Sequence, residues 1–176
     1  MFLLYFSTKV ANMDFISHGL WGGVAFGRKN KKSFWLSFIF GIAPDVLAFG
    51  LFFAQRFLGS GNFFGGPPDP RIIPQYVYSI YSVTHSFLIF GTAFLLIWLI
   101  FKHPIWEMGA WGLHIALDIF THSSRFFPTP FLWPLSDFKV NGIGWGSPVI
   151  FFPNVGVLAI LYTWFLVYKK YYAKTP

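Results

Sequence analysis

The stretch Gly112-Leu-His-Ile-Ala-Leu-Asp-Ile-Phe-Thr-His122 is mainly apolar but carries three ionisable side chains. His114, Asp118 and His122 follow one another at i, i+4 spacing, so one helix would present all three on one face. Ionisable groups inside apolar helices are expensive to desolvate, and they persist where they pair, line a wet cavity or bind a metal. The stretch therefore predicts a buried helix that carries part of a metal site.

The composition around this stretch is typical of a membrane protein. Of the 176 residues, 55% are hydrophobic and 23% aromatic, and the mean hydropathy is +0.56. Only 11% are charged, whereas soluble domains have about 25%. The chain has no cysteine, which excludes disulfides, thiolate metal sites and cysteine nucleophiles.

The apolar segments predict an all-α integral membrane bundle of about five helices. The expected helices are 14–26, 33–58, 75–101, 105–123 and 149–168, with Gly- and Pro-rich loops at 59–74 and 124–148. Pro44 is expected to break the second helix, and aromatic residues of the second loop, such as Phe127 and Trp145, are expected at headgroup level. Residues 1–12 are expected to be an N-terminal extension, and residues 13–176 a single domain.

The net charge of +7 is concentrated in basic clusters at 28–32 and 169–174. Because these clusters flank apolar spans, the positive-inside rule explains them better than nucleic-acid binding, and we expect no nucleic-acid partner. The rule places both clusters, and also Lys102, on the cytoplasmic side of the membrane.

This topology brings the polar residues of four helices into one layer. At a rise of about 1.5 Å per residue, His18, His114 and Asp118 lie about 15–21 Å from the cytoplasmic ends of their helices. Asp45 lies at a similar depth, and His85 and His122 lie somewhat further out. We therefore predict a polar His/Asp site between the first four helices.

Imidazole and carboxylate ligands suit Zn²⁺, Mn²⁺, Fe²⁺ or Ni²⁺. A catalytic zinc site keeps a position for water, whose pKa falls to about 7 on the metal. Asp118 lies between two histidines and could bridge two metals, which would favour phosphoester hydrolysis. His122 could be a ligand, a group that orients a ligand, or a general acid-base. Arg125 could steady a phosphate or be a surface arginine, and His103 is expected outside the site.

Five short motifs occur in order along the chain: Asp14-Phe-Ile-Ser-His18-Gly-Leu-Trp-Gly22, Gly41-Ile-Ala-Pro-Asp45, Thr84-His-Ser86, Gly112-Leu-His114-Ile-Ala-Leu-Asp118 and Phe131-Leu-Trp-Pro134-Leu. Together they resemble the LexA-regulated, membrane-bound metal-dependent hydrolases of bacteria. That family is thought to be distantly similar to the zinc-dependent phospholipase C and single-strand nuclease superfamily. The resemblance implies a helical zinc site that acts on phosphoesters.

Carried over to this chain, the resemblance implies one metal held by Asp45, His85, His114 and Asp118. It implies a second metal held with the help of His18 and Asp118. We expect zinc, with manganese as the alternative, and catalytic roles for His122 and Asp45. The expected location is a bacterial inner membrane, with a phospholipid or another phosphoester as substrate. Ser82-Val83 stands where members of the family often carry an arginine.

Three other functions fit the same residues. The cluster could be the transit site of a membrane transporter or metal-binding carrier. Paired histidines could ligate a b-type haem, although the accompanying aspartates argue against haem. The polar residues could also satisfy one another in a membrane scaffold without any catalytic role.

Overall fold

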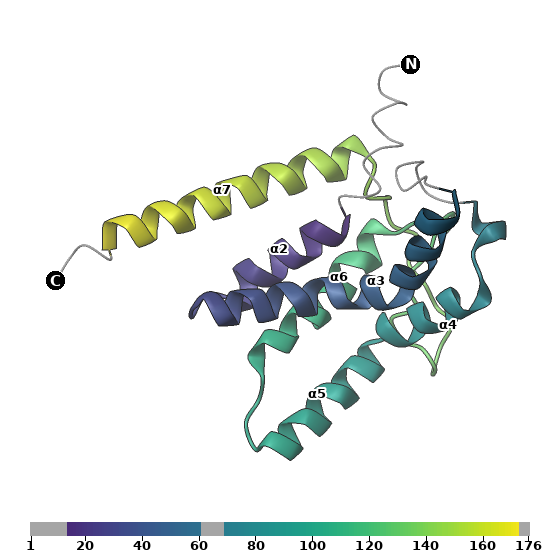
Figure 1. Ribbon diagram of the computed structural model, residues 1–176, viewed down its shortest axis with the longest axis horizontal. Coiled ribbons are helices and arrows are strands. Elements are labelled where there is room, and N and C mark those ends of the chain that lie inside the picture. Colours follow the sequence, from purple (N-terminus) through teal and green to yellow (C-terminus); the bar gives the residue numbers. More distant parts are fainter. Residues whose placement is uncertain (1–13, 61–68, 173–176) are drawn as a thin grey trace.

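The computed structural model describes residues 14–60 and 69–172, and this part of the chain is all-α (Figure 1). Its helices are α2 (Asp14–Phe26), α3 (Lys31–Ser60), α4 (Gln75–Thr84), α5 (Phe87–Phe101), α6 (Gly109–Thr121) and α7 (Pro148–Tyr172). Two short 3-10 turns, η2 (Pro70–Ile72) and η3 (Trp106–Met108), precede α4 and α6. The predicted helical class is confirmed, and the expected extension 1–12 lies outside the described residues.

Fewer helices reach membrane-spanning length than the sequence predicts. Lys31–Gly59 in α3 and Pro148–Val167 in α7 are long and apolar enough to cross a membrane, and α4 with α5 adds a third candidate if the bent pair is one span. Helices α2 and α6 have 13 residues each. That is about 20 Å of helix, against a hydrocarbon thickness of about 30 Å. The expectation of five spanning helices is therefore corrected to two or three candidate spans in the described residues.

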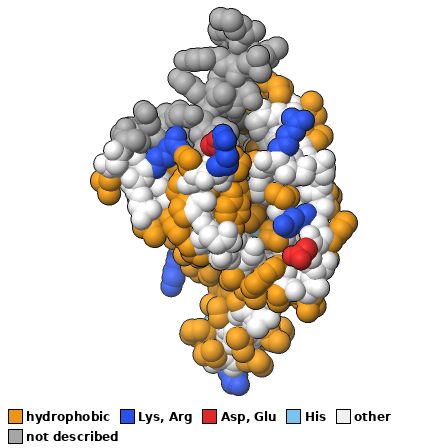
Figure 2. Space-filling view, turned by 90° about the vertical axis from the view of Figure 1, so that its right-hand side faces the viewer, with side chains coloured by type: hydrophobic (Ala, Val, Ile, Leu, Met, Phe, Trp, Pro, Cys, Tyr) orange, Lys and Arg blue, Asp and Glu red, His pale blue; other side chains and the backbone are white. Residues whose placement is uncertain are grey.

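The surface of these helices is that of a membrane protein. Leu99 and Ile100 on α5 are more than half exposed, as are Ile160 and Leu166 on α7. Figure 2 shows hydrophobic side chains over much of one face, with a few Lys and Arg side chains between them. Apolar patches of this extent mark contact with lipid or with other proteins, and the two long apolar helices favour lipid.

The centre of the fold is the contact between α2, α3 and α6 (Figure 1). A Cβ atom added at Gly22 would lie 2.6 Å from the carbonyl oxygen of Ser37 on α3 and 2.8 Å from the Cβ of Ala110 on α6. Only a residue without a side chain fits this crossing point, as is common where helices pack in lipid. The close contact brings the polar faces of the three helices together.

Hydrogen bonds attach α7 to the outer side of α2. The Trp21 indole donates to Oδ1 of Asn154 at 2.7 Å, and the Asn154 amide donates to the Ser17 hydroxyl at 2.9 Å. Tyr162 donates to the carbonyl oxygen of Leu20 at 2.9 Å. Because Ser17 precedes His18, these bonds also fix the segment of α2 that carries the histidine.

The expected helix break is found at another position. The α-helix continues through Pro44, whose carbonyl oxygen accepts a hydrogen bond from Thr84 Oγ1 at 3.2 Å. The break lies instead at His85-Ser86, where α4 and α5 meet at an angle of 58°. The Ser86 hydroxyl caps α5 by accepting from the backbone N–H groups of Leu88 and Ile89, which is a preferred N-cap arrangement. His85 therefore lies in the break between two helices.

Gly22→Ala is expected to lower the free energy of unfolding by about 1–3 kcal/mol, because the added methyl group overpacks the three-helix contact. The matched control is Gly91→Ala on α5, where an added Cβ would meet no described atom within 4 Å. There the substitution should be neutral or stabilising by up to about 1 kcal/mol. Thermal unfolding in detergent, followed by circular dichroism, compares the two variants. Equal unfolding midpoints would contradict the close contact at Gly22.

Candidate metal centre

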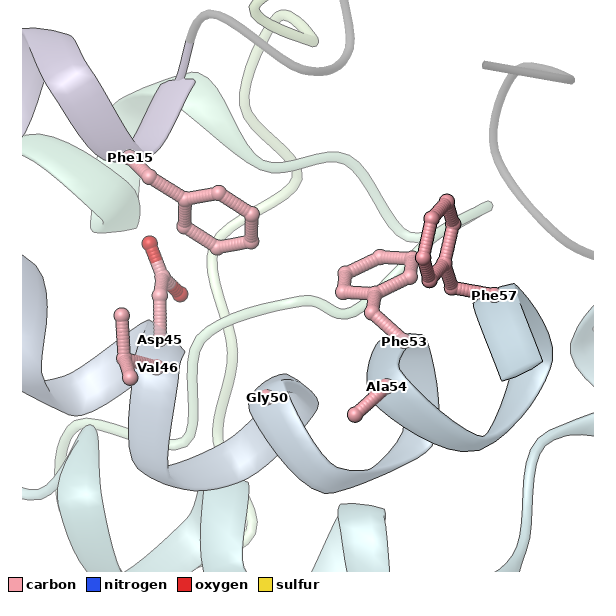
Figure 3. Close-up of a pocket in the computed structure, with 7 residues that line it drawn as sticks. All are labelled: Phe15, Asp45, Val46, Gly50, Phe53, Ala54 and Phe57. Carbon is pink, nitrogen blue, oxygen red and sulfur yellow. The ribbon is translucent and has the colours of Figure 1, made fainter. Parts of the chain in front are cut away.

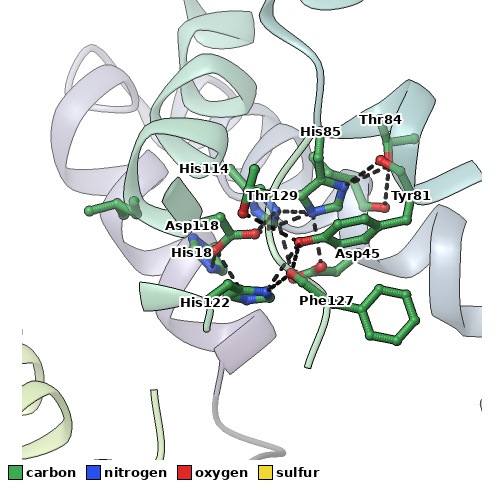
Figure 4. A network of polar contacts seen from close by, with 12 residues as sticks. His18, Asp45, Tyr81, Thr84, His85, His114, Asp118, His122, Phe127 and Thr129 are labelled. Carbon is green, nitrogen blue, oxygen red and sulfur yellow. Dashed lines mark hydrogen bonds and ion pairs between the residues drawn. The ribbon is translucent and has the colours of Figure 1, made fainter. Parts of the chain in front are cut away.

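The six predicted site residues come together in one cluster (Figure 4). The cluster draws on α2 (His18), α3 (Asp45), the break between α4 and α5 (His85), α6 (His114 and Asp118) and the C-terminal end of α6 (His122). His122 was expected inside a helix that runs to residue 123, but α6 ends at Thr121 and His122 is its extended C-cap. The predicted convergence of the polar residues is confirmed.

Asp118 is the centre of the cluster, and it is completely buried. One carboxylate oxygen, Oδ1, lies 2.9 Å from Nε2 of His18 and 3.6 Å from Nε2 of His122. The other, Oδ2, lies 3.3 Å from Nε2 of both His85 and His114. Asp118 thus presents one oxygen to each of two pairs of imidazoles, as a bridging ligand would.

Backbone carbonyl groups set the orientation of three of the histidines. Nδ1 of His114 lies 2.7 Å from the carbonyl oxygen of Gly41, and Nδ1 of His122 lies 2.8 Å from that of Phe127. Nδ1 of His85 lies 3.1 Å from the carbonyl oxygen of Tyr81, on the helix that precedes it. A carbonyl oxygen only accepts, so Nδ1 of each neutral ring carries the proton and Nε2 carries the lone pair. This is the usual way in which a protein orients an imidazole toward a metal.

The inward lone pairs leave the centre of the cluster rich in electrons. Nε2 of His85 and Nε2 of His114 are only 3.0 Å apart, and Asp45 reaches them with Oδ1 at 3.3 Å and Oδ2 at 3.7 Å. Neither carboxylate oxygen of Asp118 accepts a hydrogen bond of good geometry from the described residues. A cation bound among these two lone pairs and two carboxylates would relieve their mutual repulsion.

The spacing of these atoms fits a metal ion. Asp45, His85, His114 and Asp118 each offer one ligand atom, and these atoms lie within 4.8 Å of one another. Ligands about 2.0–2.2 Å from a tetrahedral zinc are about 3.3–3.6 Å apart. Five contacts among the four residues, from 3.0 to 3.7 Å, are near that spacing, whereas the full set of four ligand atoms extends to within 4.8 Å. The donor set of imidazole and carboxylate suits zinc and other first-row divalent metals alike.

His18 and His122 lie on the other side of Asp118 from this group of four (Figure 4). The ring of His18 lies against that of His114, with centroids 3.9 Å apart. His122 is the most accessible member of the cluster, with 10% of its side chain exposed, whereas the side chains of the other five are at most 4% exposed. His122 is therefore the histidine of the cluster that is most open to solvent.

Several neighbours of the site were not identified from the sequence. Tyr81 is buried, stacks on His85 with centroids 3.7 Å apart, and donates to the carbonyl oxygen of Phe127 at 3.0 Å. Its position four residues before His85 on a helix is a signal that could have revealed it. Phe127 and Trp145 were expected at headgroup level, but both are buried, and Trp145 lies edge-on to His18 at 5.1 Å. His103 and Arg125 are exposed.

Comparison with protein-family models, with curated proteins and with solved structures finds no match to this chain.

The purified protein is expected to contain a bound divalent metal, which is lost in the His114→Ala and Asp118→Asn variants. Each variant removes one ligand atom from the group of four, and Asp118→Asn also replaces a charged bridging oxygen with a neutral amide. Mass spectrometry of metals in the detergent-purified protein measures the loss. His103→Ala is the matched control, since it removes an exposed imidazole and should leave the metal content unchanged. Equal metal content in all variants would contradict a site at Asp118.

Proposed function

We propose that this chain is a membrane-embedded, metal-dependent hydrolase that cleaves a phosphoester bond. The observation that carries the proposal is the arrangement around Asp118, with one carboxylate oxygen toward His85 and His114 and the other toward His18 and His122. Such a bridging carboxylate suits two metal ions about 3.5–4 Å apart, which is the arrangement that favours phosphoester hydrolysis. The motif resemblance to the LexA-regulated, membrane-bound metal-dependent hydrolases supports the same function.

In this proposal Asp45, His85, His114 and Asp118 hold one metal ion, and His18 with Asp118 helps to hold a second. Zinc is the preferred ion and manganese the alternative. When bound, the metal lowers the pKa of a water molecule to about 7 and polarises a phosphoryl oxygen. Asp45 also lies at the end of the site that faces a cavity, where its carboxylate can position the attacking water beside the phosphoester.

His122 is the proposed general acid-base. Its Nδ1–H is held by the carbonyl oxygen of Phe127, and its Nε2 faces Asp118. The ring is therefore oriented so that Nε2 can take a proton from water or give one to the leaving group. Its partial exposure allows the proton to be exchanged with solvent.

The proposed location is a bacterial inner membrane with the basic ends of the spans in the cytoplasm. Lys31 and Lys32 begin α3, and Lys102 follows α5. At the end of α7, Lys169 and Lys170 follow the candidate span. All of these ends then obey the positive-inside rule.

A metal carrier is the second candidate, and the burial of the ligands is the observation that favours it. The side chains of Asp45, His85, His114 and Asp118 are at most 4% exposed, which suits an ion held in transit between two sides of a membrane. The two functions differ in their products. A carrier moves the metal ion into liposomes and forms no product from phosphoesters. A hydrolase forms the product and moves no metal ion.

Wild-type protein in detergent is expected to hydrolyse a phosphoester, such as a phospholipid or a nitrophenyl phosphodiester, in a reaction that chelators abolish and added zinc or manganese restores. His114→Ala and Asp118→Asn should lower the rate by more than about 100-fold, since even the partners that orient metal ligands account for 10–100-fold. His103→Ala should retain the wild-type rate. Metal uptake by liposomes without hydrolysis of any phosphoester would favour the carrier instead.

His122→Gln is expected to lower kcat by about 10²–10⁴-fold, the usual contribution of a general acid-base. It should leave the metal in the group of four in place, because Nε2 of His122 lies 3.6 Å from Oδ1 of Asp118 and not beside Oδ2, which faces His85 and His114. Steady-state kinetics and metal analysis of the same preparation measure both effects. Loss of all bound metal, with activity lost in proportion, would show that His122 acts as a ligand and would contradict the acid-base role.

A further inference from the structure

A cavity of about 330 Å³ opens beside Asp45, and its other walls are apolar (Figure 3). Its volume is at the lower end of the range of ligand pockets, about 300–1,000 Å³. The lining residues besides Asp45 are Phe15, Val46, Gly50, Phe53, Ala54 and Phe57. The cavity therefore combines one carboxylate, which belongs to the metal-binding group, with walls of hydrocarbon.

The shape of the cavity follows from the sequence of α3. Residues 46, 50, 53, 54 and 57 recur at helical spacing, so they form one stripe along the second half of the helix. Phe15 on α2 forms the facing wall, where its ring packs edge-on against Phe53 with centroids 6.1 Å apart. From Asp45 to Phe57 the stripe is about 18 Å long at 1.5 Å per residue. The cavity is thus a groove that starts at the cluster and runs along the helix.

The surroundings of the groove indicate what fills it. It lies on a helix that is long and apolar enough to cross a membrane. Val46 and Phe57 in its wall are about half exposed, and Leu47, Leu51 and Leu58 beside it are more exposed still. Apart from Asp45, the lining residues that the structure describes offer no polar side chain to a water-soluble ligand. In a bilayer, the molecule that meets such a groove is a lipid chain.

We propose that this groove holds one hydrocarbon chain of a membrane lipid and so brings the phosphoester of that lipid to Asp45 and the metal-binding cluster. The substrate class is then a long-chain lipid phosphoester that enters sideways from the bilayer. This inference rests on the proposed hydrolase function for the bond that is cleaved. The binding of the chain is a separate property and can be tested without catalysis.

Gly50 offers a variant that fills the groove without disturbing the helix. A Cβ added there would meet one described atom within 4 Å, Cγ1 of Val46 at 3.6 Å, which is an ordinary van der Waals contact. Gly50→Leu therefore extends into open space, and it also replaces a poor helix former by a good one. Gly91→Leu on α5 is the matched control, because it makes the same change on an apolar helix remote from the groove. Unchanged metal content and an unfolding midpoint no lower than that of the wild type verify that both variants fold.

The test uses the full-length protein in vesicles of phosphatidylethanolamine and phosphatidylglycerol that contain a phosphatidylcholine with a diazirine on its acyl chain. After illumination, peptide mass spectrometry compares labelling of the groove, at Phe53 to Phe57, with labelling of the exposed residues of α7. We expect the groove-to-α7 ratio to fall at least about tenfold in Gly50→Leu, the effect of excluding two buried methylene groups. Gly91→Leu should keep the wild-type ratio.

A ratio that is the same in wild type and Gly50→Leu would overturn the inference, because it would show only general contact with the bilayer. Cross-links between two copies of the chain at the groove, in place of lipid adducts, would overturn it as well. Hydrolysis is measured separately, as the ratio of the rates on long-chain and short-chain phosphodiesters, which should fall in Gly50→Leu alone. If labelling behaves as expected but no phosphoester is hydrolysed, the hydrolase proposal fails and the lipid groove stands.

Discussion

Two buried carboxylates, Asp45 and Asp118, must be neutralised at the centre of an apolar fold, and the rest of the structure depends on how this is done. An uncompensated buried charge destabilises a protein by several kcal/mol. The histidines beside them do not supply the compensation in their neutral form, because carbonyl acceptors hold the protons of His85 and His114 on Nδ1. A divalent cation held by the inward Nε2 atoms and the carboxylates would supply the charge that balances Asp45 and Asp118. The imidazole and carboxylate ligands and the negative charge of the two aspartates thus both favour a divalent cation.

Backbone carbonyl groups orient three histidines of this cluster; two of these carbonyls lie near helix ends, and the third, that of Gly41, lies within α3. The carbonyl of Phe127 belongs to the loop after α6, and that of Tyr81 lies in the last turn of α4. Each already accepts another hydrogen bond, from the Tyr81 hydroxyl and from the His85 N–H respectively. The carbonyl of Tyr81 thus lies at the bend of 58° between α4 and α5, where His85 follows α4. As the C-cap of α4, His85 lies outside the regular helix. In this position its Nε2 lies 3.3 Å from Oδ2 of Asp118.

The i, i+4 row on α6 and the convergence of four helices could be predicted from the sequence, because both follow from helical periodicity and from the high free energy of polar groups in lipid. The location of the break could not. Pro44 has the stronger intrinsic tendency to break a helix, yet α3 continues through it and Thr84 satisfies its carbonyl group. The carbonyl partners of the histidines were also invisible, since a backbone acceptor has no sequence signature. Trp145 and Phe127 were misplaced because composition alone cannot distinguish an aromatic at the headgroups from one packed against a site.

The burial of the cluster conflicts with the proposed catalysis only if one entrance must serve both water and the phosphoester. Asp118 separates two sides of the site. On one side Asp45 borders the apolar groove, and on the other the partly exposed His122 faces the opposite oxygen of Asp118. A lipid phosphoester that arrives along the groove would meet the group of four, while protons and water exchange past His122. In the proposed enzyme, separate access of this kind would keep bulk water away from the candidate metal ligands and so strengthen the electrostatic interactions in the site. The short helices α2 and α6, of 13 residues each, would then place His18, His114 and Asp118 between the two routes.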